Sequence, residues 1–234
     1  MKTPVFWKNK NSFISILLIP LSYMWQLGSI LNTKKKQKFN IPIIIIGNVV
    51  AGGAGKTPTV ISLANKLINS NIKVHIILKG YKSAAKKSIQ VNTKIHTYKD
   101  VGDEAIICSK IAPTWVGKSR IASINNATNN GADLVILDDG LQDSSIESDL
   151  NILVFSGLQG IGNGRIIPSG PMREHLLKAV DKSDLAIIIE EDKNNIKELI
   201  SKNIPVVNAN LKIEDKDLKN FKKKKVMAFC GIGY

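Results

Sequence analysis

The sequence predicts an α/β domain in which helices cover both faces of a mostly parallel sheet. Three observations lead to this prediction. Short uninterrupted apolar runs recur along the chain, helical segments fall between them, and a glycine-rich loop separates the first apolar run from the first helix. At 234 residues, of which 44% are hydrophobic, the chain is long enough for one such domain with a sizeable core.

The apolar runs indicate strands that are buried on both faces, because their side chains do not alternate between apolar and polar. We predict strands at residues 41–46, 73–78, 134–137, 152–155, 185–189, 206–207 and 226–229. Apolar side chains at helical spacing predict helices at residues 59–67, 103–111, 120–129 and 195–201. The basic stretch at residues 79–99 has few apolar side chains to bury, so we expect a surface loop or hairpin there.

An uncharged and mostly apolar run covers residues 11–33. As one helix it would be roughly 35 Å long, which exceeds a hydrocarbon core of about 30 Å, although Pro20 and several polar side chains weaken it as a span. We predict that residues 1–38 form an N-terminal membrane-anchor helix with a basic flank, and that residues 39–234 form the main domain. The anchor could insert or lie in the interface. A helix packed on the domain and a signal peptide are the alternatives.

The formal net charge of +14 is concentrated in the N-terminal part of the chain. Before Asp100 there are 16 lysines and no acidic residue, whereas the rest of the chain is close to neutral. A positive field of this kind attracts nucleic acid, anionic lipid head groups or phosphorylated substrates. The lysine cluster at residues 34–38 directly follows the apolar run and could hold anionic lipid at a membrane surface.

The glycine-rich loop is the most specific motif. Its core consists of Gly52, Gly53, Ala54, Gly55, Lys56 and Thr57. Glycines let the backbone curl so that its amides point at phosphate oxygens, and the start of the following helix adds a favourable dipole. Lys56 would bridge the β- and γ-phosphates of a nucleotide, and the Thr57 hydroxyl would bind Mg²⁺. The first residue of this motif is usually glycine, and here it is Val50. The loop is therefore a variant of the phosphate-binding loop, and it predicts a P-loop NTPase-like fold.

A second motif follows the predicted strand at residues 134–137. Asp138 and Asp139 end this strand, which places their carboxylates at the carboxyl edge of the sheet, beside the glycine-rich loop. We therefore predict that Thr57, Asp138 and Asp139 hold Mg²⁺. An aspartate that only shapes a turn is the simpler alternative.

These motifs and the residues around them resemble the lipid A 4'-kinase family (tetraacyldisaccharide 4'-kinase). The resemblance rests on five blocks that occur in the family's order: residues 46–58, 102–104, 138–142, 168–174 and 229–233. The family's own loop also lacks the early glycine. A single block would be weak support, but five in order are highly specific.

The resemblance implies transfer of the ATP γ-phosphate to the 4'-hydroxyl of a tetraacyldisaccharide 1-phosphate, with Mg²⁺, at the cytoplasmic face of the bacterial inner membrane. It also implies a partner at an anionic membrane surface and no nucleic acid. Asp103 would be the catalytic base that accepts the sugar hydroxyl proton, together with Lys56 and Asp139 as catalytic residues. Gln142 would help to organise the metal site, and Arg173 would meet a phosphate.

Several residues depart from the family pattern. Lys79 stands where the family has arginine, which keeps the charge and loses the bidentate geometry. Asp143 replaces a frequent histidine, and Ala105 replaces a proline. Family members also extend well beyond the end of this sequence. The resemblance implies that a histidine in that further part pairs with the aspartate corresponding to Asp103. The histidines of this chain (His75, His96 and His175) match no such motif, so we expect them to be surface or packing residues.

Two other functions are compatible with the motifs. A membrane-associated partitioning-type ATPase has a similar loop, but it carries a lysine where this chain has Ala51. A truncated and catalytically inactive remnant of the kinase would keep nucleotide or lipid binding without transfer. The two cysteines, Cys108 and Cys230, are too few for a disulfide framework or a metal cluster, and we expect reduced thiols.

Overall fold

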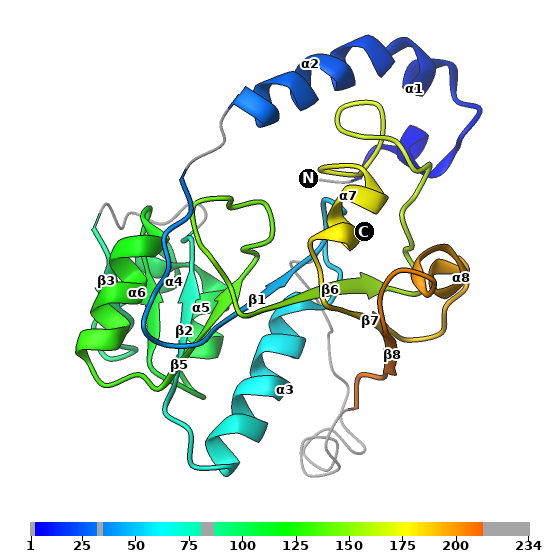
Figure 1. Cartoon of the computed structure of the whole chain (residues 1–234). Helices are drawn as coiled ribbons and strands as arrows, with labels where there is room; N and C mark the ends of the chain where they lie inside the picture. Colours follow the sequence, from blue (N-terminus) through cyan, green and yellow to red (C-terminus); the bar gives the residue numbers. More distant parts are fainter. Residues whose placement is uncertain (1–2, 32–34, 81–86, 213–234) are drawn as a thin grey trace, which may run out of the picture.

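The computed structural model describes residues 3–31, 35–80 and 87–212. The strands are β1 (Ile43–Gly47), β2 (Val74–Leu78), β3 (Ile89–Gln90), β4 (Thr114–Val116), β5 (Leu134–Asp138), β6 (Leu150–Ser156), β7 (Leu185–Ile189) and β8 (Val206–Ala209). The helices are the 3₁₀ turn η1 (Val5–Lys8), α1 (Phe13–Leu17), α2 (Ile19–Leu31), α3 (Lys56–Asn69), α4 (Tyr98–Val101), α5 (Asp103–Cys108), α6 (Arg120–Asn129), α7 (Leu176–Asp181) and α8 (Ile196–Ile200). Figure 1 shows the sheet at the centre, with α1 and α2 set apart above it.

The strands form one eight-stranded sheet in the order β3-β4-β2-β5-β1-β6-β7-β8. Neighbouring strands are parallel, except for the antiparallel pair of β3 and β4 at one edge. The chain moves from β1 toward β2 on one side and later toward β6 on the other, so the strand order reverses at β1. Ligands of open parallel sheets bind at the carboxyl ends of the strands beside such a reversal. This confirms the predicted α/β fold with a mostly parallel sheet.

Helices cover both faces of the sheet because the central strands bury side chains on both sides. Along β1, Ile43 and Ile45 join a core with residues of α6, α7 and α8. Ile44 and Ile46 point the other way and join a core with residues of α3, α4 and α5. The side chains of β1 do not alternate between apolar and polar because both faces of the strand are covered by apolar cores, as expected for parallel sheets.

The sequence predictions locate most of the elements. Strands β1, β2, β5, β6, β7 and β8 and helices α3, α5, α6 and α8 lie at or near the predicted ranges. Strand β4 was not predicted, because it is only three residues long, and the short helices α4 and α7 were also missed. The stretch predicted as a loop or hairpin contains β3, which pairs antiparallel with β4. The strand predicted at residues 226–229 lies outside the described residues.

The N-terminal apolar run forms two helices instead of one. The α1 helix ends at Leu17, and α2 begins at Ile19. Pro20 has no amide hydrogen and its ring would clash with the carbonyl of Ile16, so one continuous helix is broken here, and Pro20 instead occupies the first turn of α2. Among the described residues, no helix combines the length and the apolar character needed to cross a bilayer. The expected single helix of about 35 Å is therefore wrong.

Candidate active site

The glycine-rich loop connects β1 to α3, as predicted. Gly55 immediately precedes α3 and has a φ of 87°, a left-handed conformation that disfavours other residues. A Cβ atom at this position would also overlap the Ile189 side chain. Val50 stands where the usual motif begins with glycine, and it is buried and forms an isolated antiparallel bridge with Met172. The departure at Val50 is thus explained, because extended backbone at this position accommodates any residue.

The Lys56 ammonium lies at the start of α3 and is held by two partners. Its Nζ atom is 3.3 Å from Asn48 Oδ1 and 3.8 Å from Asp139 Oδ1. Asn48 is fully buried, and its amide nitrogen donates a 2.7 Å hydrogen bond to the Val50 carbonyl. This residue was not predicted as a site residue. The only sequence signal for it was its position directly after β1, in a block that resembles the family loop.

Asp138 lies at the end of β5 and is 4% exposed. Its Oδ2 accepts a 3.1 Å hydrogen bond from the Thr57 hydroxyl, whereas its buried Oδ1 has no hydrogen-bond partner among the described residues. Burial raises the pKa of Asp138 to about 6, and the nearby Lys56 opposes this rise. The structure therefore brings Thr57 and Asp138 together, as predicted.

The residues present fit a magnesium ion. A hydroxyl and a buried carboxylate with an unpaired oxygen are hard oxygen ligands, and Mg²⁺ typically takes only one or two carboxylates besides water and phosphate oxygens. Within the described ranges, no three His, Cys, Asp or Glu side chains gather around a possible metal position.

Asp139 directly follows β5 and has a φ of 57°. Its two carboxylate oxygens accept hydrogen bonds of 2.7 and 2.9 Å from Arg173. The same carboxylate also forms an ion pair with Lys56. Burial alone would raise the pKa of Asp139, but Lys56 and Arg173 outweigh it and hold this pKa below its ordinary value. Asp139 thus orients two cationic side chains in this structure, and its role in holding Mg²⁺ stays a prediction.

Gln142 joins the loop after β5 to the loop after β1. Its Nε2 donates to the Asn48 carbonyl at 2.9 Å and to Glu174 Oε1 at 3.0 Å, while its Oε1 accepts a 3.2 Å hydrogen bond from Arg173. Glu174 also pairs with Lys182. Gln142 and Arg173, predicted separately, are therefore parts of one network at the carboxyl edge of the sheet.

Asp103 begins α5 and lines the same cleft as Lys56 and Asp138. It is exposed, and its Oδ1 accepts a 3.0 Å hydrogen bond from the Glu104 amide. Glu104, which was not predicted, is adjacent. Although the residue is exposed overall, partial desolvation raises the pKa of Glu104, against the attraction of Lys56. Two carboxylates are thus available on this side of the cleft.

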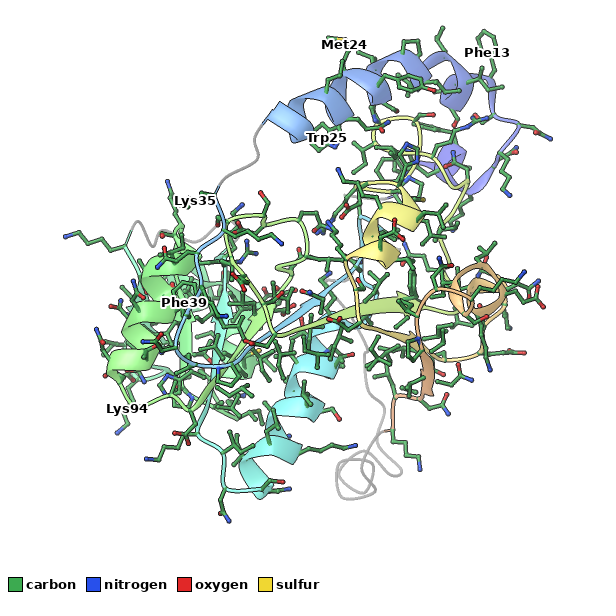
Figure 2. The ribbon with its side chains drawn as sticks, in the orientation of Figure 1. Phe13, Met24, Trp25, Lys35, Phe39 and Lys94 are labelled. Carbon is green, nitrogen blue, oxygen red and sulfur yellow. The ribbon has the colours of Figure 1, made fainter. Side chains whose placement is uncertain are left out.

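The cleft has a volume of about 1450 Å³. The charged residues described above line the cleft, and so do Lys79 and Lys118. Trp25 and Gly28 of α2 contribute to the lining from the N-terminal segment. Figure 2 shows Trp25 on the side of α2 that faces the rest of the chain, whereas Phe13 points away from it.

Arg120 forms part of the same cleft, although its side chain is only 5% exposed. It donates a 2.8 Å hydrogen bond to Asp143 and a 2.7 Å hydrogen bond to the Asp139 carbonyl. Asp143, which departs from the family pattern, thus compensates the charge of a buried arginine. Neither residue was predicted as a site residue, because their partners lie in other segments.

The three histidines all lie in the described ranges, and none of them lines the cleft. His75 is buried on β2, where its Nδ1 accepts a 3.2 Å hydrogen bond from Trp115, and burial lowers its pKa. Cys108 is a free buried thiol whose pKa burial raises to about 12. Cys230 lies outside the described residues.

The chain is similar to known proteins over its whole length. The tetraacyldisaccharide-1-P 4'-kinase family (LpxK) matches residues 14–234. The tetraacyldisaccharide 4'-kinase of Paramagnetospirillum magneticum is 38% identical, over 100% of this chain and 72% of that protein. The corresponding protein of Jannaschia sp. is 40% identical, over 82% of this chain and 59% of that protein. The chain therefore spans about three fifths to three quarters of the length of these relatives.

Solved structures have the same fold. The crystal structure of LpxK from Aquifex aeolicus in complex with ATP has a TM-score of 0.68 at 24% identity and covers 84% of this chain and 64% of that one. The signal recognition particle receptor FtsY from Elizabethkingia anophelis has a TM-score of 0.51 at 16% identity, over 88% and 68% of the two chains. At these identities the likeness concerns the fold alone. The sequence relatives and the family match show that this chain belongs to the tetraacyldisaccharide-1-P 4'-kinase family.

Proposed function

We propose that this chain binds ATP and transfers its γ-phosphate to the 4'-hydroxyl of tetraacyldisaccharide 1-phosphate, a step of lipid A biosynthesis. The observation that carries the proposal is the convergence of Lys56, Asp138 and Arg173 in one cleft at the start of α3, where the Thr57 hydroxyl is hydrogen-bonded to Asp138. Membership of a kinase family supports the same reaction. A partitioning-type ATPase shares only the loop and would not require the other blocks of family sequence.

Phosphoryl transfer needs positioning and charge neutralisation more than covalent chemistry from the protein. Lys56 would offset the negative charge on the β- and γ-phosphates, and the loop amides at residues 52–57 would cradle their oxygens. Mg²⁺ bound by the Thr57 hydroxyl and the Asp138 carboxylate would supply further neutralisation at the same phosphates. Asp139 would keep Lys56 and Arg173 directed at the transferred group.

The acceptor hydroxyl must lose a proton as the new bond to phosphorus forms. Asp103 would accept this proton, because its exposed carboxylate lines the cleft that holds Lys56 and Asp138. Glu104 would support Asp103 by keeping negative charge beside it. In this assignment the proton moves from the sugar hydroxyl to Asp103, and the leaving group is ADP.

The acceptor side of the cleft has side chains that would attract an anionic lipid. Lys79 and Lys118 line the cleft and would attract the 1-phosphate of the acceptor. Phe13 and Leu17 are 77% and 67% exposed, with further exposed apolar side chains along α1 and α2. Helices of this length with exposed apolar side chains suit an interfacial anchor, so we place α1 and α2 at the cytoplasmic face of the inner membrane.

Transfer of ³²P from ATP to the purified acceptor in detergent micelles tests the proposal. We expect labelled lipid from the 234-residue chain and none from Lys56→Ala, because this variant loses the charge at the phosphates. Lys66→Ala is the matched control, since Lys66 is exposed at the other end of the same helix. Equal labelling by the Lys56→Ala and Lys66→Ala proteins would refute the assignment. ATP binding without transfer would indicate an inactive remnant.

A further inference from the structure

Two buried serines of the N-terminal helices α1 and α2 form hydrogen bonds with the rest of the chain. Of the α1 and α2 residues whose burial the structure describes, only Ser15 and Ser22 are buried, at 0% and 5% exposure. A surface helix usually buries an apolar stripe against its own domain. Here most of the apolar side chains are exposed while two hydroxyls face inward, so hydrogen bonds are a main part of the contact between these helices and the rest of the chain.

The docking partner is the loop between β6 and α7. Ser15 Oγ donates a 2.6 Å hydrogen bond to the Ser169 carbonyl, and Ser169 Oγ donates a 2.6 Å hydrogen bond to the Ser15 carbonyl. Asn163 Nδ2 donates to Ser15 Oγ and to the Ser169 carbonyl, at 2.9 and 3.0 Å. Ser22 Oγ accepts from the Ser169 amide at 3.2 Å. We call Ser15, Ser22, Asn163 and Ser169 the serine interlock.

All four interlock residues are buried. A buried polar group that loses its partner is costly, so these contacts act together and specify one arrangement of the helices. Gly170 follows Ser169 in the same loop, and a Cβ atom there would overlap the Asn163 side chain and the Arg165 carbonyl. The loop backbone is therefore closely packed where it carries the interlock.

The same loop continues directly into the phosphate site. The Ala51 amide donates a 2.7 Å hydrogen bond to the Pro171 carbonyl, and the Arg173 amide donates a 2.7 Å hydrogen bond to the Val49 carbonyl. Arg173 then pairs with Asp139. One short segment thus contacts the N-terminal helices at Ser169 and the glycine-rich loop at Pro171 and Arg173.

We propose that Ser169 is a positioning residue, which sets the placement of α1 and α2 relative to the glycine-rich loop and so guides the acylated acceptor to the γ-phosphate. The inference rests on the proposed function. Trp25 and Gly28 of α2 line the cleft together with Ile167 of the loop. An acceptor whose acyl chains lie along α2 therefore presents its sugar hydroxyl at a distance from Lys56 that the serine interlock determines. Ser169 itself is fully buried and is not among the described residues that line the cleft.

The proposal predicts a selective effect on the acceptor. Ser169→Ala removes one hydroxyl and leaves the Ser15 carbonyl with one partner fewer. A net hydrogen bond of this kind changes an equilibrium constant by about fivefold. We expect the Kd for tetraacyldisaccharide 1-phosphate to rise at least about fivefold, and the Kd for ATP to stay within about twofold, because the glycine-rich loop keeps its own contacts with Pro171 and Arg173.

The experiment titrates ATP, and separately the acceptor in detergent micelles, into the full chain and its variants by calorimetry. The variants are Ser169→Ala, Ser15→Ala and the double variant. Ser183→Ala is the matched control, since Ser183 is also buried and donates a 2.7 Å hydrogen bond to the Ala179 carbonyl, away from the interlock. Because Ser15 and Ser169 bind each other, the double variant is expected to lose less affinity than the sum of the single variants.

Hydrogen exchange of the amides at residues 13–24, measured on the same proteins, gives a readout without the acceptor. We expect faster exchange there in Ser169→Ala and unchanged exchange in Ser183→Ala. An unchanged acceptor Kd in Ser169→Ala, or an equal rise in the Kd for ATP, overturns the positioning role. If the unmodified chain binds no acceptor, the proposed function and its positioning role both fail, and the exchange data alone then decide whether the interlock docks the helices.

Discussion

The Thr57 hydroxyl donates a 3.1 Å hydrogen bond to one carboxylate oxygen of Asp138 and leaves the other buried without a hydrogen-bond partner in the described part of the chain. This pair joins the first turn of α3 to the end of β5. A buried carboxylate with an unpaired oxygen is costly in the free protein. That cost is relieved when a cation binds, so the pair favours a metal-bound nucleotide.

We expect Asp138→Asn to reduce phosphate transfer by about hundredfold or more, because the amide keeps the shape and the contact with Thr57 but removes the charge that holds the metal. Transfer assays with increasing Mg²⁺ concentration measure the effect. Asp181→Asn, at the exposed end of α7, is the control and should retain full activity. Activity of Asp138→Asn equal to that of the control would exclude a metal-binding role.

The raised pKa of Asp138 predicts a pH dependence of stability in the nucleotide-free protein without Mg²⁺. The ordinary value is 3.8 and the folded value is about 6, so the folded state binds the proton more tightly than the unfolded state. The contribution of Asp138 to the free energy of unfolding should therefore fall as the pH rises from about 4 to about 6, by at most about 3 kcal/mol. Urea unfolding across this range tests it. In Asp138→Asn this contribution should disappear, and an unchanged pH profile of the variant would contradict the assignment.

Arg173→Lys should lower transfer by about tenfold to hundredfold, since lysine keeps the charge but does not reproduce the contacts with both Asp139 and Gln142. The pKa of Asp139 should rise at the same time, because the side-chain hydrogen bond from Arg173, which the lysine is not expected to reproduce, is one of the causes that lower it. Carboxyl titration by NMR and transfer kinetics measure the two effects. Lys178→Ala, on the nearby helix α7, serves as the comparison; a similar loss there would mean that the effect is not specific to Arg173.

The pair of the buried Arg120 and the partly buried Asp143 predicts a stability effect. Arg120→Met should destabilise the fold by about 1–3 kcal/mol, because it leaves Asp143 without its cation and removes a hydrogen bond to the Asp139 carbonyl. Replacing both residues, as Arg120→Met with Asp143→Ser, should recover part of this loss. Urea unfolding of the single and double variants measures it. A double variant that is less stable than Arg120→Met would show that the charge pair is not the cause.

The exposed apolar side chains of α1 predict membrane binding. Phe13→Ser with Leu17→Ser should weaken binding to vesicles containing anionic phospholipid by roughly tenfold or more, because burying large apolar side chains contributes about 1.5–3 kcal/mol each. Vesicle sedimentation measures this binding. Leu199→Ser is the matched control, since Leu199 is 50% exposed on α8. Equal vesicle binding by all these proteins would remove α1 from the membrane interface.

The amino-acid sequence by itself determined the fold class, the glycine-rich loop, and the place of Thr57 and Asp138 in the site. Local patterns are sufficient for these features, because apolar runs without alternation indicate doubly covered strands and each motif follows a strand. The family resemblance then led to Gln142, Arg173 and Asp103. The division into residues 1–38 and 39–234 stays a prediction.

Only the tertiary structure decided which of these residues contact each other. Lys56 meets Asn48, Arg173 meets Asp139, and Ser15 meets Ser169 because folding brings separate segments of the chain together. It also decided that Ser15 and Ser22 of the N-terminal apolar run are buried. Hydrophobic periodicity could not reveal these contacts, because hydrogen bonds between distant segments depend on the strand order and on the exact course of the loops, and neither leaves a periodic signal in the sequence.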